Sequence, residues 1–196
     1  MTVGPHTGRR LILRDSVDNA GIRAFAEADG WTYQGDIARD PANQAFYEAK
    51  WSLPGGLSAH FVADEFVDAR YLVVAGDDDA GVQEASARLE AALDVWSVAD
   101  LETNFDVCVY PFEQARSVLL LGAGSPERAV DSVFTRVLEA VRHKEPRVRR
   151  AAVQAMVYAG WPEYREPLAE LAARDADPEV AREAGLALRV LEERHG

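Results

Sequence analysis

The chain has 196 residues, is 48% hydrophobic and 28% charged, and carries a formal net charge of −12. These proportions are typical of a soluble globular protein with one large or two small domains. No run approaches the length of a membrane span, and the first residues lack an apolar signal region, so we expect a cytoplasmic protein without membrane contact. The single cysteine, Cys108, excludes an internal disulfide and a zinc-finger-type site.

Negative charge is concentrated in the first part of the chain. Residues 1–122 contain 9 Lys and Arg against 20 Asp and Glu, whereas residues 123–196 contain 12 against 13. Because DNA affinity comes largely from neutralising phosphates, this distribution argues against general nucleic-acid binding. An acidic half suits a basic partner, or it serves solubility alone. The preference for Arg over Lys indicates a GC-rich, bacterial genome.

The first 110 residues are predicted to mix strands and helices. The expected elements are a strand at 9–14, a helix from about 16 to 29, a loop at 32–43, strands at 45–53 and 57–63 joined by a turn at 54–56, a strand at 71–74, a helix at about 77–96 and a last strand at 105–110. Their order resembles a split βαβ, ferredoxin-like layout, so we predict an acidic α+β domain over residues 1–110.

The remainder, residues 111–196, is predicted to be entirely helical. The expected helices span about 112–121, 126–142, 146–159, 163–174 and 178–194. Pro146 can occupy the first position of the third helix, and Gly160 can adopt the left-handed conformation that ends it. The segments 125–127 and 177–179 each offer a cap, a first-turn proline and a negative charge at a helix start.

An internal repeat relates these helices. A shift of 32 residues aligns Glu145-Pro-Arg-Val-Arg-Arg-Ala-Ala with Asp177-Pro-Glu-Val-Ala-Arg-Glu-Ala, and the preceding helices align at a shift of 30. These runs resemble the HEAT-type (armadillo-like) helical repeat family, which implies stacked helix pairs and partner-binding faces. Arg149 matches the family's usual arginine, whereas Ala181 at the equivalent place weakens an inter-repeat ladder. Since two repeats leave an open end, we expect the N-terminal domain to pack on the array as its cap.

Two sets of residues on this array are candidate partner contacts. Arg147, Arg150, Gln154 and Tyr158 form one polar stripe of the predicted helix 146–159. The stripe can bind an acidic peptide or a phosphate, or it can be a solvated face paired with nearby acids.

The second set is Leu186 and Val190, which lie outside the apolar stripe of the last helix. They form a partner or dimer patch, or the ordinary end cap of the chain, or a contact with the other domain.

Few residues suggest catalysis or metal binding. Asp77-Asp78-Asp79 can bind a hard cation, but more readily stabilise the first turn of a helix. Cys108 with His60 as base is a conceivable nucleophile pair, although Cys108 has the surroundings of a core residue. The sequence contains no Walker, HExxH or GxSxG motif, so we expect no cofactor and no metal.

We therefore favour a non-enzymatic protein-interaction module, either an adaptor or an immunity protein that inhibits a basic partner. Two alternatives stay open. A small enzyme requires a deep pocket that gathers Asp64, Asp77 or Cys108, and nucleic-acid binding requires a free cationic face at Arg147 and Arg150.

Overall fold

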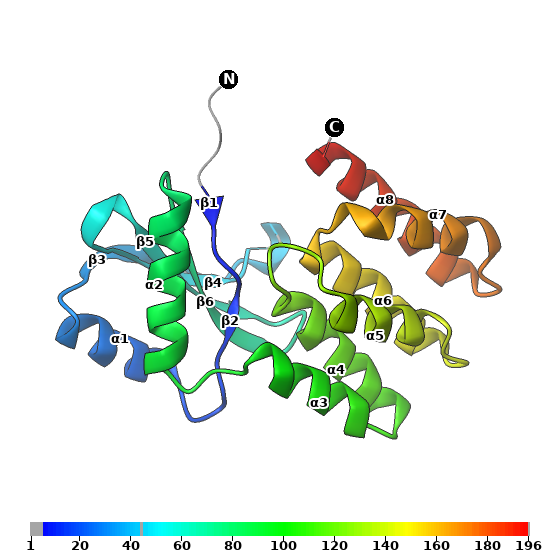
Figure 1. Cartoon of the computed structure of the whole chain (residues 1–196), viewed down its shortest axis with the longest axis horizontal. Helices are drawn as coiled ribbons and strands as arrows, with labels where there is room; N and C mark the ends of the chain where they lie inside the picture. The colour runs from blue at the N-terminus through cyan, green and yellow to red at the C-terminus, as the bar shows by residue number, and fades with distance from the viewer. Residues whose placement is uncertain (1–5, 44, 196) are drawn as a thin grey trace. The chain divides into compact units, whose positions relative to one another are not determined.

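A computed structural model describes residues 6–43 and 45–195 of the chain (Figure 1). The chain divides into two compact units, residues 1–97 and 98–196. The division falls ahead of the helix at 98–107, whereas the sequence suggested a boundary between residues 110 and 111.

Among the described residues, the first unit contains a six-stranded antiparallel sheet. A meander of four strands supplies most of it: β3 (Thr32–Ile37), β4 (Tyr47–Ser52), β5 (Ser58–Asp64) and β6 (Ala69–Gly76). Two short strands, β1 (His6–Thr7) and β2 (Leu11–Ile12), both pair with β6. Helix α1 (Asn19–Ala28) precedes the meander and α2 (Asp79–Ala92) follows it, which confirms the predicted α+β class.

Both helices contribute to a core on one face of the sheet. Ile22 of α1 and Leu89 of α2 are fully buried, as are Ala59 and Phe61 on β5. Because successive strand residues point to opposite faces, the residues that alternate with Ala59 and Phe61 face away from this core. Burial of a side chain such as Phe61 contributes about 1.5–3 kcal/mol of folding free energy.

The predicted strand at 105–110 is wrong. Residues Val98–Val107 form helix α3, in which Leu101 and Phe105 lie one turn apart and are both buried. The described residues after α2 contain no strand, so the ferredoxin-like strand order does not arise, and β1 and β2 instead pair antiparallel with β6.

The predicted loop at 32–43 is also wrong in part, because it contains β3. The pairing of β3 with β4 shifts register between Tyr33 and Gly35, which indicates a bulge. Gly35 has a φ of 122°, a backbone conformation that favours glycine. A glycine that normally signals a loop is therefore part of the strand.

The second unit is an array of helical hairpins, visible as the green-to-red part of Figure 1. Its helices are α3, α4 (Pro111–Ala123), α5 (Asp131–Val141), α6 (Pro146–Ala159), α7 (Arg165–Arg174) and α8 (Pro178–His195). Helices α4, α6 and α8 pack on one another in sequence, while α3, α5 and α7 pack on α4, α6 and α8. None of the described helices is both long and apolar enough to cross a membrane.

The helix ends explain where the hairpins turn. Gly160 ends α6 with a φ of 69°, and Pro146 begins it, as predicted. Asp177 caps α8, because its Oδ1 accepts hydrogen bonds from the amides of Glu179 (2.9 Å) and Val180 (3.2 Å). The predicted cap at Ser125 is wrong: its hydroxyl donates to the Leu121 carbonyl at 2.8 Å, and α5 begins only at Asp131.

Candidate functional site

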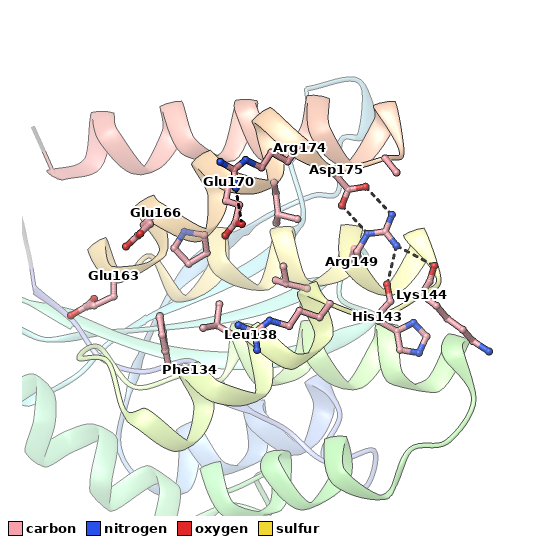
Figure 2. A pocket seen from close by; sticks show the side chains of 15 residues that line it. Phe134, Leu138, His143, Lys144, Arg149, Glu163, Glu166, Glu170, Arg174 and Asp175 are labelled. Atoms are coloured by element: carbon pink, nitrogen blue, oxygen red, sulfur yellow. Dashed lines mark hydrogen bonds and ion pairs between the residues drawn. The ribbon is translucent and has the colours of Figure 1, made fainter.

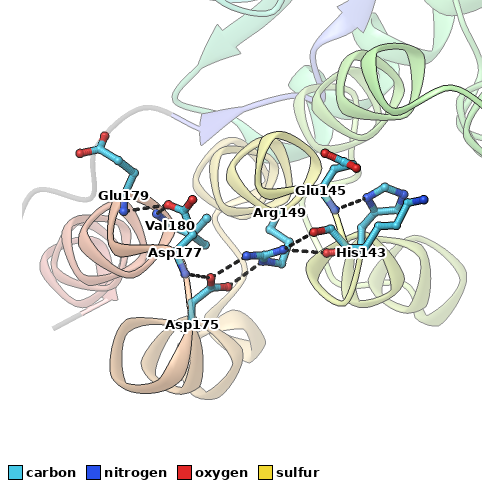
Figure 3. Close-up of polar contacts among 8 residues, drawn as sticks. His143, Glu145, Arg149, Asp175, Asp177, Glu179 and Val180 are labelled. Atoms are coloured by element: carbon cyan, nitrogen blue, oxygen red, sulfur yellow. Dashed lines mark hydrogen bonds and ion pairs between the residues drawn. The ribbon is translucent and has the colours of Figure 1, made fainter.

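Arg149 of α6 forms hydrogen bonds with both the α5–α6 turn and the α7–α8 turn (Figure 3). Its Nε and Nη2 each donate to the Asp175 carboxylate at 2.8 Å, and its Nη1 donates to the carbonyls of His143 and Lys144 at 2.9 and 3.1 Å. Asp175 in turn accepts from the amide of Asp177 at 2.9 Å. The two turns are therefore held in a fixed relation by one largely buried ion pair.

Hydrogen bonds from Arg149 hold the pKa of Asp175 below its usual value. The carboxylate therefore stays ionised where the turns meet. The equivalent position of the second repeat is Ala181, which has no charged side chain and cannot form the same ion pair.

A stack of three aromatic rings joins α5 to the start of the next hairpin. The rings of Phe134 and Tyr164 lie 5.1 Å apart, and those of Tyr164 and Trp161 lie 5.4 Å apart, all nearly parallel. Trp161 is also fixed through its Nε1, which donates to the carbonyl of Pro126 at 2.9 Å. Since Trp161 and Tyr164 are buried, this stack fixes α5 against the segment that directly precedes α7.

A groove of about 710 Å³ opens between α5 and α7 (Figure 2). Its floor is apolar and comes from Phe134, Leu138 and Val141 of α5 together with Pro167 and Leu171 of α7. The volume lies within the usual range of about 300–1,000 Å³ for ligand pockets. The floor residues are half-buried, except for Leu171, which is buried.

Three carboxylates form the α7 edge of the groove. Glu166 and Glu170 lie four residues apart on α7, and Glu163 lies in the 3-10 turn Pro162–Tyr164 that directly precedes this helix; all three are exposed. Arg174 lies 3.6 Å from Glu170 and balances its charge. The end of the groove at the α5–α6 turn is basic instead, where Figure 2 shows His143 and Lys144.

The sequence did not point to this groove. The apolar residues of α5 were assigned to an inward stripe, whereas part of that stripe is the groove floor. The signal that was available is the spacing of Glu163, Glu166 and Glu170, which places three acids along one line beside Pro167 and Leu171.

The predicted polar stripe on α6 does not line this groove, and two of its four residues contact neighbouring helices. Arg150 donates from Nε to Glu183 of α8 at 3.1 Å, and the guanidinium of Arg147 lies 5.9 Å from the ring centre of Phe112 on α4. Gln154 and Tyr158 are half-buried. Because Glu183 balances the charge of Arg150, the cationic face that nucleic-acid binding requires is reduced.

Leu186 and Val190 lie on the surface of α8 and are 44% and 45% exposed. Neither residue lines the groove between α5 and α7. Their role as a partner patch stays a prediction.

Of the residues considered for catalysis in the first unit, His60 and Asp77 line one hollow of the sheet surface, whereas Asp64 does not line it. Asp64 accepts hydrogen bonds from the amides of Phe66 and Val67 and closes the β5–β6 turn, while Asp77 follows the far end of β6. Cys108 follows α3 in the second unit. Asp78 caps α2, and among the described residues no group of three or more His, Cys, Asp or Glu side chains can hold a metal.

Comparison with known families agrees with the architecture of the second unit. The family model for HEAT repeats matches residues 111–189, from the first residue of α4 into α8. This part of the chain is therefore a HEAT-type helical repeat region. Neither a search of curated proteins nor a search of solved structures gave a significant match.

Proposed function

We propose that the protein is a protein-interaction module whose HEAT-type region binds a basic partner in the groove between α5 and α7. HEAT repeats are generally protein-interaction modules. The observation that carries the proposal is the apolar floor edged by Glu163, Glu166 and Glu170. An amphipathic segment places apolar side chains on such a floor and charged side chains on its rim.

The negative charge of the α7 edge of the groove favours a partner with basic side chains. Glu163 and Glu166 have no cation within ion-pairing distance among the described residues, so both carboxylates are available to a basic side chain. A partner with Lys or Arg along this edge gains complementary charge and faster association. An adaptor and an inhibitor of the immunity type both use such a surface.

Charge reversal tests the proposal. The double variant Glu163→Lys/Glu166→Lys is compared with Glu192→Lys/Glu193→Lys, which changes net charge equally at exposed positions of α8 outside the groove. Partner recovery from source cells is quantified by affinity purification and mass spectrometry. We expect the groove variant to lose the proteins that the wild type enriches, and the α8 variant to keep them. Equal loss, or no loss, contradicts the proposal.

A further inference from the structure

A hydrogen-bonded chain of three polar side chains lies on the sheet face opposite the core of the first unit. Ser58 and His60 are two residues apart on β5, so both side chains emerge on the same face. Ser58 Oγ lies 2.9 Å from His60 Nε2. The Ala75 carbonyl is a second acceptor for this hydroxyl, but at 3.4 Å. The imidazole is therefore the closer acceptor for the Ser58 proton.

Glu48 of β4 completes the chain. The register pairs Lys50 with His60, which places Glu48 diagonally across from His60 on the same face. His60 Nδ1 lies 2.6 Å from Glu48 Oε1. A carboxylate only accepts hydrogen bonds, so it holds the neutral imidazole with its proton on Nδ1. Nε2 is then free to accept the proton of Ser58.

These side chains line a hollow of about 570 Å³ in the sheet surface. Val62 and Val73 supply apolar walls, Lys50 and Arg10 bring positive charge, and Asp77 brings a carboxylate. The hollow therefore has room for a small acyl group, and its lining includes cations of the kind that stabilise a developing negative oxygen.

We propose that Ser58 is a nucleophile for small carboxylic esters, with His60 as general base and Glu48 as a positioning residue. Ser58 Oγ attacks the ester carbonyl, and its proton passes to His60 Nε2. The bond to the leaving alcohol breaks, and the alcohol oxygen takes the proton from His60. Water then attacks the acyl carbonyl and gives a proton to His60. The bond from the acyl carbon to Ser58 Oγ breaks as this oxygen takes that proton from His60, and the carboxylic acid is released.

This inference concerns the first unit and does not depend on the groove between α5 and α7. It also differs from the Cys108–His60 pair considered from the sequence, because the structure places Ser58 next to His60.

The test is covalent labelling of the full-length protein with an alkyl fluorophosphonate, followed by peptide mass spectrometry. Ser16 is an internal control, because its hydroxyl bonds to the Asp94 carboxylate without an imidazole. We expect labelling of Ser58 to exceed that of Ser16 by about 10²-fold or more, the usual contribution of a general base. Labelling of Ser58 at the rate of Ser16 overturns the proposal, and this comparison needs no variant.

Variants assign the roles. Ser58→Ala should abolish both the labelling and an initial burst with p-nitrophenyl acetate, and His60→Gln should lower the labelling rate about 10²-fold. Glu48→Gln should lower the rate, whereas Glu48→Asp should restore part of it, with unchanged thermal unfolding in both. An undiminished rate in His60→Gln contradicts the assignment of His60 as base.

Discussion

Gly122 of α4 lies directly against Ala155 of α6. A β-carbon built on Gly122 would lie 2.4 Å from the Cα of Ala155, which is a backbone atom that cannot move aside. The two helices therefore pack at a distance that only glycine permits at this point. This contact is at the centre of the HEAT-type region, because α6 also packs on α5 and α8.

Gly122→Ala should destabilise the protein although alanine favours helix formation. Overpacking of this kind typically costs about 1–3 kcal/mol, against a propensity gain of about 1 kcal/mol. Gly185 is the matched control, since its added β-carbon would meet only the Ala172 β-carbon at 3.8 Å. Urea unfolding should show a lower midpoint for Gly122→Ala and an equal or higher one for Gly185→Ala. A stabilised Gly122→Ala protein would mean that the helices are farther apart.

The ion pair between Arg149 and Asp175 should make stability depend on pH in the acid range. Arg149 lowers the pKa of Asp175, so the ionised carboxylate stabilises the fold. This contribution is complete above the unfolded-state pKa of about 3.9 and is lost as the pH falls through the lower folded-state value. Thermal unfolding between pH 7 and 3 should show a smaller loss in Asp175→Asn than in the wild type.

Arg149→Ala should destabilise the protein by about 3 kcal/mol at pH 7, because it leaves a buried carboxylate without its partner. Arg174→Ala is the control, since its pair with Glu170 is exposed and worth less than about 1 kcal/mol. Equal effects of the two changes would show that the Arg149 pair does not organise the turns.

Tyr164→Phe should leave stability unchanged or raise it by about 1 kcal/mol. The hydroxyl of Tyr164 is buried and has no hydrogen-bond partner in the described part of the chain, and such a group costs about 1–3 kcal/mol. The stacking on Phe134 and Trp161 needs only the ring. Tyr164→Leu removes the ring and should destabilise the protein in calorimetry. A marked loss of stability in Tyr164→Phe would reveal a partner for the hydroxyl.

Local signals predicted that the chain from residue 111 onward is helical, and they placed α6 most closely. Pro146 and Gly160 act through their own backbone restrictions, so a sequence pattern is enough to place both ends of α6. The prediction that Ser125 caps the next helix was wrong because its hydroxyl donates to the carbonyl of Leu121, at the end of the preceding helix. The prediction of a strand at 105–110 was wrong because burial of Leu101 and Phe105, which lie one helical turn apart, favours a helix instead.

Neither the groove between α5 and α7 nor the chain of Ser58, His60 and Glu48 could be predicted from such local patterns alone. The groove lies between α5 and α7, and its lining residues come together through contacts between hairpins such as the stacking of Tyr164 on Phe134. Alternation already places Ser58 and His60 on one face, but the diagonal position of Glu48 follows from the register of β4 and β5.

The most direct test of the proposed function is site-specific photo-crosslinking. A photoreactive phenylalanine analogue replaces Leu138 on the groove floor or, as the control, the exposed Glu192 on α8. We expect irradiation in source cells to give a discrete crosslinked protein with the probe at position 138, lost on Glu163→Lys/Glu166→Lys, and none at position 192. A crosslink at 192 alone, or one at 138 that survives the charge reversal, would contradict binding in the groove.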